Sequence, residues 1–133
     1  MKSNFIKFLM VVPGFLMLNN AIMFIVSPAE IVSDLGMPLL EGIGLSTQLA
    51  DLGAFFTFSA LLIFYGVFSA KGEYLRITAI LLGLAATLRV IAWGLNGAGL
   101  AVELIAAEIA LVIWLLVAAV YIENSKSASE VDQ

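Results

Sequence analysis

The chain has 133 residues, of which 62% are hydrophobic and 12% are charged. Soluble domains are about 45–50% apolar and about 25% charged, so this composition is too apolar for a surface that faces water. We therefore expect an integral membrane protein, and the length predicts one domain without a separate catalytic module. The net charge of −4 and only six basic residues argue against a nucleic-acid partner, which needs a basic stripe.

The chain contains no cysteine and no histidine. Without cysteine there are no disulfides, thiolate metal sites, iron–sulfur clusters or thiol redox chemistry. Without histidine the usual ligand of haem, zinc and di-iron sites is missing, as is the usual general base near neutral pH. We therefore predict a non-enzymatic protein without catalytic residues. One class of metal site is still compatible with this composition, a site for a hard cation formed by carboxylates alone. The apolar segments contain few acidic residues that could form it.

Four apolar segments are long enough to cross a bilayer, which takes about 20 residues each. They cover residues 5–26, 48–70, 75–95 and 100–122. Because the turns before the third and fourth segments are short, we expect sequential antiparallel neighbours in a four-helix transmembrane bundle. The domain is predicted to cover residues 1–122, and the polar, Ser-rich residues 123–133 are predicted to be a disordered tail.

The connection between the first two spans contains a second pattern. Ser27, Pro28 and Glu30 match a capping box with proline at the first helical position, so a short helix is expected to begin there and to stop near Gly36. Its apolar residues fall on one face, which predicts a helix lying at the membrane interface. Residues 37–45 are apolar but broken by Pro and Gly, and we expect them to pack over the mouth of the bundle.

The basic residues predict the orientation. Five basic residues fall on one side of the membrane, near the N-terminus, at the connection between the second and third spans, and after the last span. They are Lys2, Lys7, Lys71, Arg76 and Lys126. The first and third connections contain no Lys or Arg. By the positive-inside rule, both termini should be cytoplasmic.

Polar residues inside the spans form one layer. At 1.5 Å per helical residue, Asn19 lies about 10 Å, Asp51 about 5 Å, Arg89 about 9 Å and Glu108 about 12 Å from the outer end of its predicted helix. An isolated charge there costs at least ~2.5 kcal/mol, so these groups should turn inward and pair. We expect Arg89 to bridge Glu108 and Asp51, with Asn19 or Asn20 satisfying the remaining donors and acceptors.

Two interpretations of this layer stay open at the sequence level. It is either a structural ion-pair network or a ligand or ion site that opens to the periplasm. Trp93 lies one helical turn from Arg89 and would stack on it, line a pocket or anchor the helix at the interface. The candidate site consists of Asn19, Asn20, Asp51, Arg89, Trp93 and Glu108.

Several short motifs stand out along the chain, namely residues 27–38, Leu88-Arg89, residues 94–97 and Glu108 in the last span. They resemble a family of small bacterial membrane proteins that is known only as a domain of unknown function, and more distantly the DoxX-type four-helix proteins. The resemblance implies a bacterial inner (cytoplasmic) membrane protein with four helices and brings no established activity. The bulky Phe55 and Phe56 depart from a Gly-rich segment that family members often carry in the second helix.

Three functions are compatible with these features. The favoured one is an accessory subunit that docks on a larger membrane complex, or on itself, or that holds a lipophilic ligand near the polar layer. The second is a small oligomeric transporter that uses Glu108 or Asp51 as a proton or cation switch. The third, suggested by the DoxX resemblance, is a quinone-linked subunit. No cofactor is expected beyond a bound lipid or quinone, and the expected partners are the bilayer and other membrane subunits.

Overall fold

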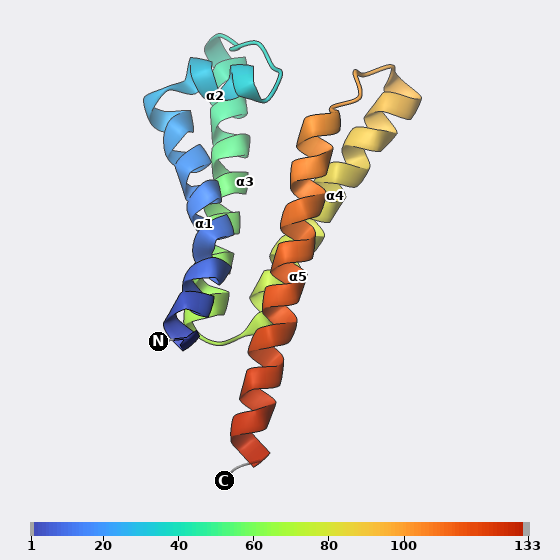
Figure 1. The fold of residues 1–133 in the computed structure, drawn as a ribbon. Helices are drawn as coiled ribbons and strands as arrows, with labels where there is room; N and C mark the ends of the chain where they lie inside the picture. Colours follow the sequence, from blue (N-terminus) through green and yellow to red (C-terminus); the bar gives the residue numbers. More distant parts are fainter. Residues whose placement is uncertain (1, 132–133) are drawn as a thin grey trace.

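A computed structural model describes residues 2–131, and this part of the chain forms five α-helices and no strands (Figure 1). The helices are α1 (Lys2–Val26), α2 (Pro28–Asp34), α3 (Gly42–Phe68), α4 (Gly72–Asn96) and α5 (Val102–Val131). All except α2 are long and apolar enough to cross a membrane. The predicted all-α membrane fold, with four spanning helices and a short helix between the first two, is confirmed.

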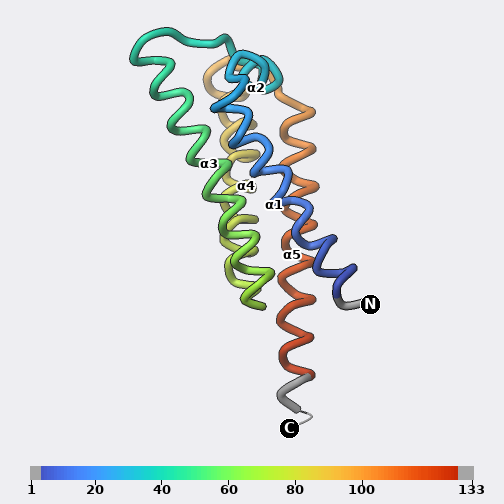
Figure 2. Tube along the Cα trace, turned by 90° about the vertical axis from the view of Figure 1, so that its left-hand side faces the viewer, coloured from blue at the N-terminus to red at the C-terminus, as the bar shows by residue number. Residues whose placement is uncertain are grey.

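The long helices form two antiparallel hairpins. α1 packs along α3, and α4 packs along α5, while the short turn between α3 and α4 joins the two hairpins at one end (Figure 1). Both termini lie toward this end, and α2 lies at the opposite one. Away from the joining turn, α3 and α5 move apart in both views (Figures 1 and 2). The bundle is therefore closed at one end and splayed at the other.

The surface is apolar and the centre is small and tightly packed. Ile25 and Leu95 are each 82% exposed, which is typical of side chains that face lipid, whereas Ile63 and Leu75 are fully buried. The buried hydroxyl of Thr78 donates to the carbonyl of Tyr74 four residues earlier, at 3.0 Å. This buried hydroxyl is thus satisfied within its own helix, as a membrane requires.

Two glycines bring helices close together at the closed end, Gly66 between α3 and α4 and Gly72 between α4 and α5. A Cβ atom at Gly66 would lie 3.1 Å from the Cβ of Tyr74 and 3.2 Å from the carbonyl oxygen of Lys71. A Cβ atom at Gly72 would lie only 2.8 Å from the carbonyl oxygen of Ala119. Small residues let backbones approach in a membrane, where no hydrophobic force drives helices together. α3, α4 and α5 therefore meet closely at this point.

A proline explains the contact between the two outer helices α1 and α5. Pro13 lies inside α1 and has no N–H, so the carbonyl of Leu9 lacks its usual helical donor. The indole N–H of Trp114 on α5 donates to this carbonyl at 3.2 Å. The hydrogen bond supplies the missing partner and links α1 to α5.

The short helix α2 forms as expected but begins differently. Ser27 makes no side-chain capping bond, so the predicted capping box is wrong. Its own N–H donates to the carbonyl of Met23, which makes Ser27 the last residue bonded in the pattern of α1. Its carbonyl then accepts the N–H of Glu30 at 3.1 Å. Ile31 and Val32 are buried, so the apolar face of α2 packs onto the bundle as predicted.

Helix α3 begins at Gly42, well before the predicted start at residue 48. The reason is a pair of hydrogen bonds between the side chain of Gln48 and the preceding loop. The buried Gln48 accepts the N–H of Leu40 at 3.1 Å and donates to the carbonyl of Pro38 at 3.0 Å. Because these bonds fold the loop against the first turns of α3, the irregular segment is shorter than expected.

Helix α5 continues to Val131, so the prediction of a disordered tail over residues 123–133 is corrected for the part that the structure describes. Arg76 on α4 binds Glu123 through both its Nε, at 3.0 Å, and a terminal amino group. The Ser125 hydroxyl donates to the carbonyl of Tyr121 at 2.8 Å. The polar residues thus find partners along the helix. Residues 132–133 lie outside the described residues.

The glycine contact predicts a destabilising substitution. Gly72→Val should lower the free energy of unfolding by about 1–3 kcal/mol, because the new side chain overlaps the backbone of α5. Thermal unfolding in detergent measures the loss. Gly53→Ala is the matched control, since a Cβ there meets nothing within 4 Å. Equal stability of Gly72→Val and the parent would contradict the close approach.

The link between Pro13 and Trp114 predicts a coupling. Trp114→Phe should cost about 1 kcal/mol beyond its loss of packing, because the Leu9 carbonyl loses its donor. In a Pro13→Ala background the alanine N–H satisfies that carbonyl, so Trp114→Phe should cost less. Unfolding of the four variants gives the coupling energy. Strict additivity would show that the indole does not replace the missing donor.

Candidate functional site

A pocket of about 410 Å³ lies between the two hairpins, in the range typical of ligand sites. It is lined by Met17, Asn20, Leu35, Met37, Leu52, Phe55, Phe56, Leu82, Ala85, Arg89, Leu104, Ala107, Glu108 and Leu111. All four long helices and the segment at the end of α2 contribute to its walls. The pocket follows from the fold, because the hairpins are joined where α3 meets α4 near Gly66 and separate toward the other end.

One ion pair lies in the wall of this pocket. The Nε of Arg89 donates to both carboxylate oxygens of Glu108, at 3.0 and 3.2 Å. The antiparallel packing of α4 and α5 brings them together, since each residue lies about 9–11 Å from the turn that joins these helices. The side chain of Glu108 is 12% exposed and that of Arg89 is 34% exposed. The carboxylate of Glu108 is thus shielded, whereas the guanidinium of Arg89 is accessible from the pocket.

Hydrogen-bond donors remain on the polar residues of the pocket. The terminal amino groups of Arg89 donate no hydrogen bond to any residue that the structure describes. The side chain of Asn20, across the pocket on α1, likewise has no partner among the described residues. Because Glu108 neutralises Arg89, the site offers donors without a net charge. Its remaining walls are apolar.

Asp51 and Asn19 do not belong to this site. Asp51 is exposed and shares the outward stripe of α3 with the exposed residues Thr47, Ala54 and Phe58. Asn19 is exposed because it lies about 100° around α1 from Asn20. The predicted bridge from Arg89 to Asp51 is therefore wrong. The prediction placed all the polar residues at one depth but had no means to fix their directions.

Trp93 also lies away from the pocket. Its side chain is 51% exposed and lines a separate apolar groove beside Val90 and Ile105, on the outer surface of α4 and α5. Neither predicted role next to Arg89 is formed. An exposed tryptophan near a helix end is typical of an anchor at the membrane interface, the third role considered.

The residues that form the apolar walls of the pocket and the loop above them are not predicted from the sequence. Met17, Met37, Leu52 and Phe55 look like any other apolar residue of a span, so no signal distinguishes them. Gln48 does carry a signal, because a buried amide in an apolar segment must find partners. Through the loop that contains Met37, it shapes one edge of the pocket.

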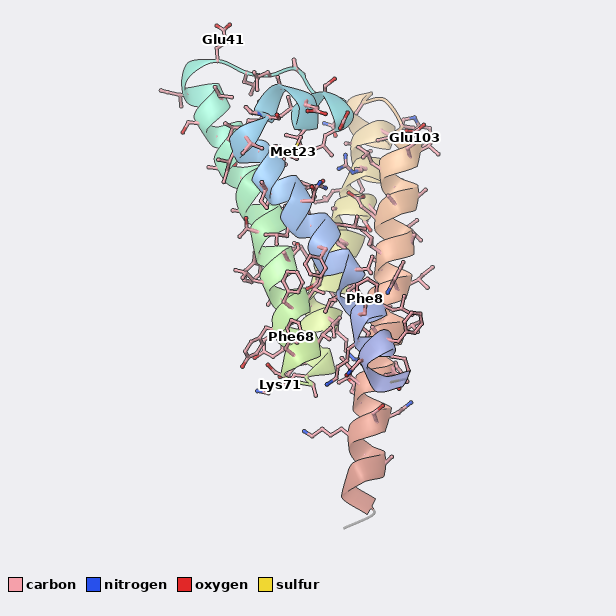
Figure 3. The ribbon with its side chains drawn as sticks, turned by 60° about the vertical axis from the view of Figure 1, so that its left-hand side comes forward. Phe8, Met23, Glu41, Phe68, Lys71 and Glu103 are labelled. Atoms are coloured by element: carbon pink, nitrogen blue, oxygen red, sulfur yellow. The ribbon has the colours of Figure 1, made fainter. Side chains whose placement is uncertain are left out.

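The charges divide between the two ends of the molecule. Glu41 and Glu103 lie at the end near the pocket, and Lys71 lies at the opposite end (Figure 3). The pocket end also carries Glu30 and Asp34, and its connections contain no Lys or Arg. We call these the acidic end and the basic end. This separation of acidic and basic residues is the basis of the predicted orientation, in which both termini are cytoplasmic.

Comparisons with known proteins find no match to a family model, a curated protein or a solved structure. The resemblance to the family of unknown function and to the DoxX-type proteins therefore stays a prediction. The site rests on its own geometry.

The ion pair predicts a double-mutant cycle. Arg89→Leu should destabilise the protein because it leaves the shielded Glu108 unpaired, and Arg89→Leu with Glu108→Leu should recover part of the loss. We expect a coupling of about 1–3 kcal/mol by unfolding in detergent. The more exposed Arg76–Glu123 pair is the matched control and should show a smaller coupling. A double variant that is worse than the sum of the singles would rule out direct pairing.

Proposed function

We propose that the chain is a non-enzymatic membrane protein that holds an uncharged, lipophilic molecule in the pocket between its hairpins. The observation that carries this proposal is the set of unpaired donors on Arg89 and Asn20 within apolar walls. In a membrane such donors are costly unless a partner satisfies them. A bound molecule with hydrogen-bond acceptors supplies that partner.

The chemistry of the walls defines the ligand class. Leu52, Phe55 and Leu111 favour an apolar body, while Arg89 and Asn20 favour a carbonyl or ester group at one end. A strongly anionic ligand is disfavoured, because Glu108 already neutralises the guanidinium. Lipid esters and quinones both meet these requirements.

The same residues favour a binding role over catalysis. Arg89 and Glu108 are the only ionisable residues among those that line the pocket, and they bind each other. Both carboxylate oxygens of Glu108 accept hydrogen bonds from Arg89, and no hydroxyl or thiol nucleophile lines the site. We further propose, from the charge pattern and the family resemblance, a bacterial inner membrane with both termini in the cytoplasm.

A transporter that uses Glu108 as a proton switch is the competing function. The carboxylate of such a carrier must release and take up protons, whereas both carboxylate oxygens of Glu108 accept hydrogen bonds from the Arg89 Nε, at 3.0 and 3.2 Å. Substrate-driven proton flux in liposomes that disappears in Glu108→Gln would favour the transporter over the proposed binding role.

A pocket-filling variant tests the binding role. The protein is purified in mild detergent, and bound molecules are identified by native mass spectrometry and by analysis of solvent extracts. Ala85→Phe should abolish retention of the ligand because it fills the pocket. Ala54→Phe adds the same side chain on the exposed face of α3 and should retain it. Parent protein without any bound molecule, or equal retention by both variants, would refute the proposal.

A further inference from the structure

A second site lies at the basic end, far from the pocket between the hairpins. A hollow of about 300 Å³ there is lined by Lys7 from α1 and by Lys126, Ser125 and Tyr121 from α5. Its floor is apolar and includes Met10 and Val67. Two ammonium groups from different helices thus share one small hollow.

The hollow continues into an apolar groove between α1 and α5. This groove has a volume of about 460 Å³, and Met10 and Tyr121 line both spaces. Ile6, Ile113 and Val117 are among its other walls, and Trp114 crosses from α5 to the carbonyl of Leu9. The polar hollow and the apolar groove therefore form one continuous surface.

The dimensions match one leaflet of a bilayer. The groove follows α5 from Ala110 to Tyr121, which is about 16 Å of helix. Half of the hydrocarbon core is about 15 Å thick. Lys126 lies about 7.5 Å of helix beyond Tyr121, a distance similar to the thickness of the headgroup region on one side of a bilayer. The cations are thus placed where phosphates are found, and the groove lies where acyl chains are found.

We propose that this surface binds one anionic phospholipid, with its phosphate between Lys7 and Lys126 and an acyl chain along the groove. Basic hollows between transmembrane helices are suited to anionic headgroups, and the Tyr121 hydroxyl adds a donor for the phosphate oxygens. The ligand must carry both a phosphate and an acyl chain. The lysines alone would bind any phosphate, and the groove alone would bind any acyl chain. The site is separate from the pocket between the hairpins and does not depend on its function.

Native mass spectrometry with added lipids tests this proposal. Phosphatidylglycerol should bind the parent protein more tightly than phosphatidylcholine with the same acyl chains. Lys7→Gln and Lys126→Gln should each weaken phosphatidylglycerol binding about fivefold, and the double variant about 25-fold. Lys71→Gln removes a charge at the same end without lining the hollow, so it should leave binding unchanged.

Two further measurements distinguish the contribution of the apolar groove from that of the lysines. Ala110→Phe narrows the groove and should weaken phosphatidylglycerol binding while both lysines remain. Inorganic phosphate should compete poorly, since it cannot occupy the groove. Full competition by phosphate would show an anion site without lipid specificity. An equal loss in Lys71→Gln and the double variant would show general surface attraction. Either result would overturn the proposal.

Discussion

The close approach of α3, α4 and α5 at Gly66 and Gly72 is the constraint on which the rest of the structure depends. Lipid tails are as apolar as the side chains they contact, so helices in a membrane are held where their backbones come close. Here that happens at the basic end, next to the turn that joins the hairpins. With the hairpins fixed at one end only, their other ends can separate, and the pocket forms in that space.

The pocket in turn explains why charges persist in so apolar a chain. Arg89 and Glu108 lie on one hairpin and satisfy each other, so the charged groups need nothing from the opposite hairpin. What faces the space are the remaining donors of Arg89 and the amide of Asn20. At the basic end, Lys7 and Lys126 come from two different helices and line one hollow. We propose different ligands for the two ends, one neutral and one anionic.

The physics of the membrane determines which features the sequence could predict. Span length predicts the four helices, and the cost of a lone buried charge predicts that Arg89 and Glu108 pair. The side of α3 on which Asp51 lies could not be predicted. A helix that contacts lipid is apolar on all sides, so its sequence does not show which face points into the bundle. The early start of α3 depends on hydrogen bonds between Gln48 and a loop, in which Gln48 both accepts and donates, and the length of α5 depends on Arg76 binding Glu123. Such contacts between segments leave little trace in local composition.

Distance measurements on the splayed bundle test the central claim most directly. Because the chain has no cysteine, spin labels can be attached to introduced pairs in lipid nanodiscs without other changes. A pair at Thr47 and Glu103 reports the separation of α3 and α5 at the acidic end, and a pair at Tyr65 and Val117 reports it near the closed end. Double electron–electron resonance should give a clearly longer distance for the first pair. Equal distances, or a shorter one at the acidic end, would contradict a bundle joined at one end and open at the other.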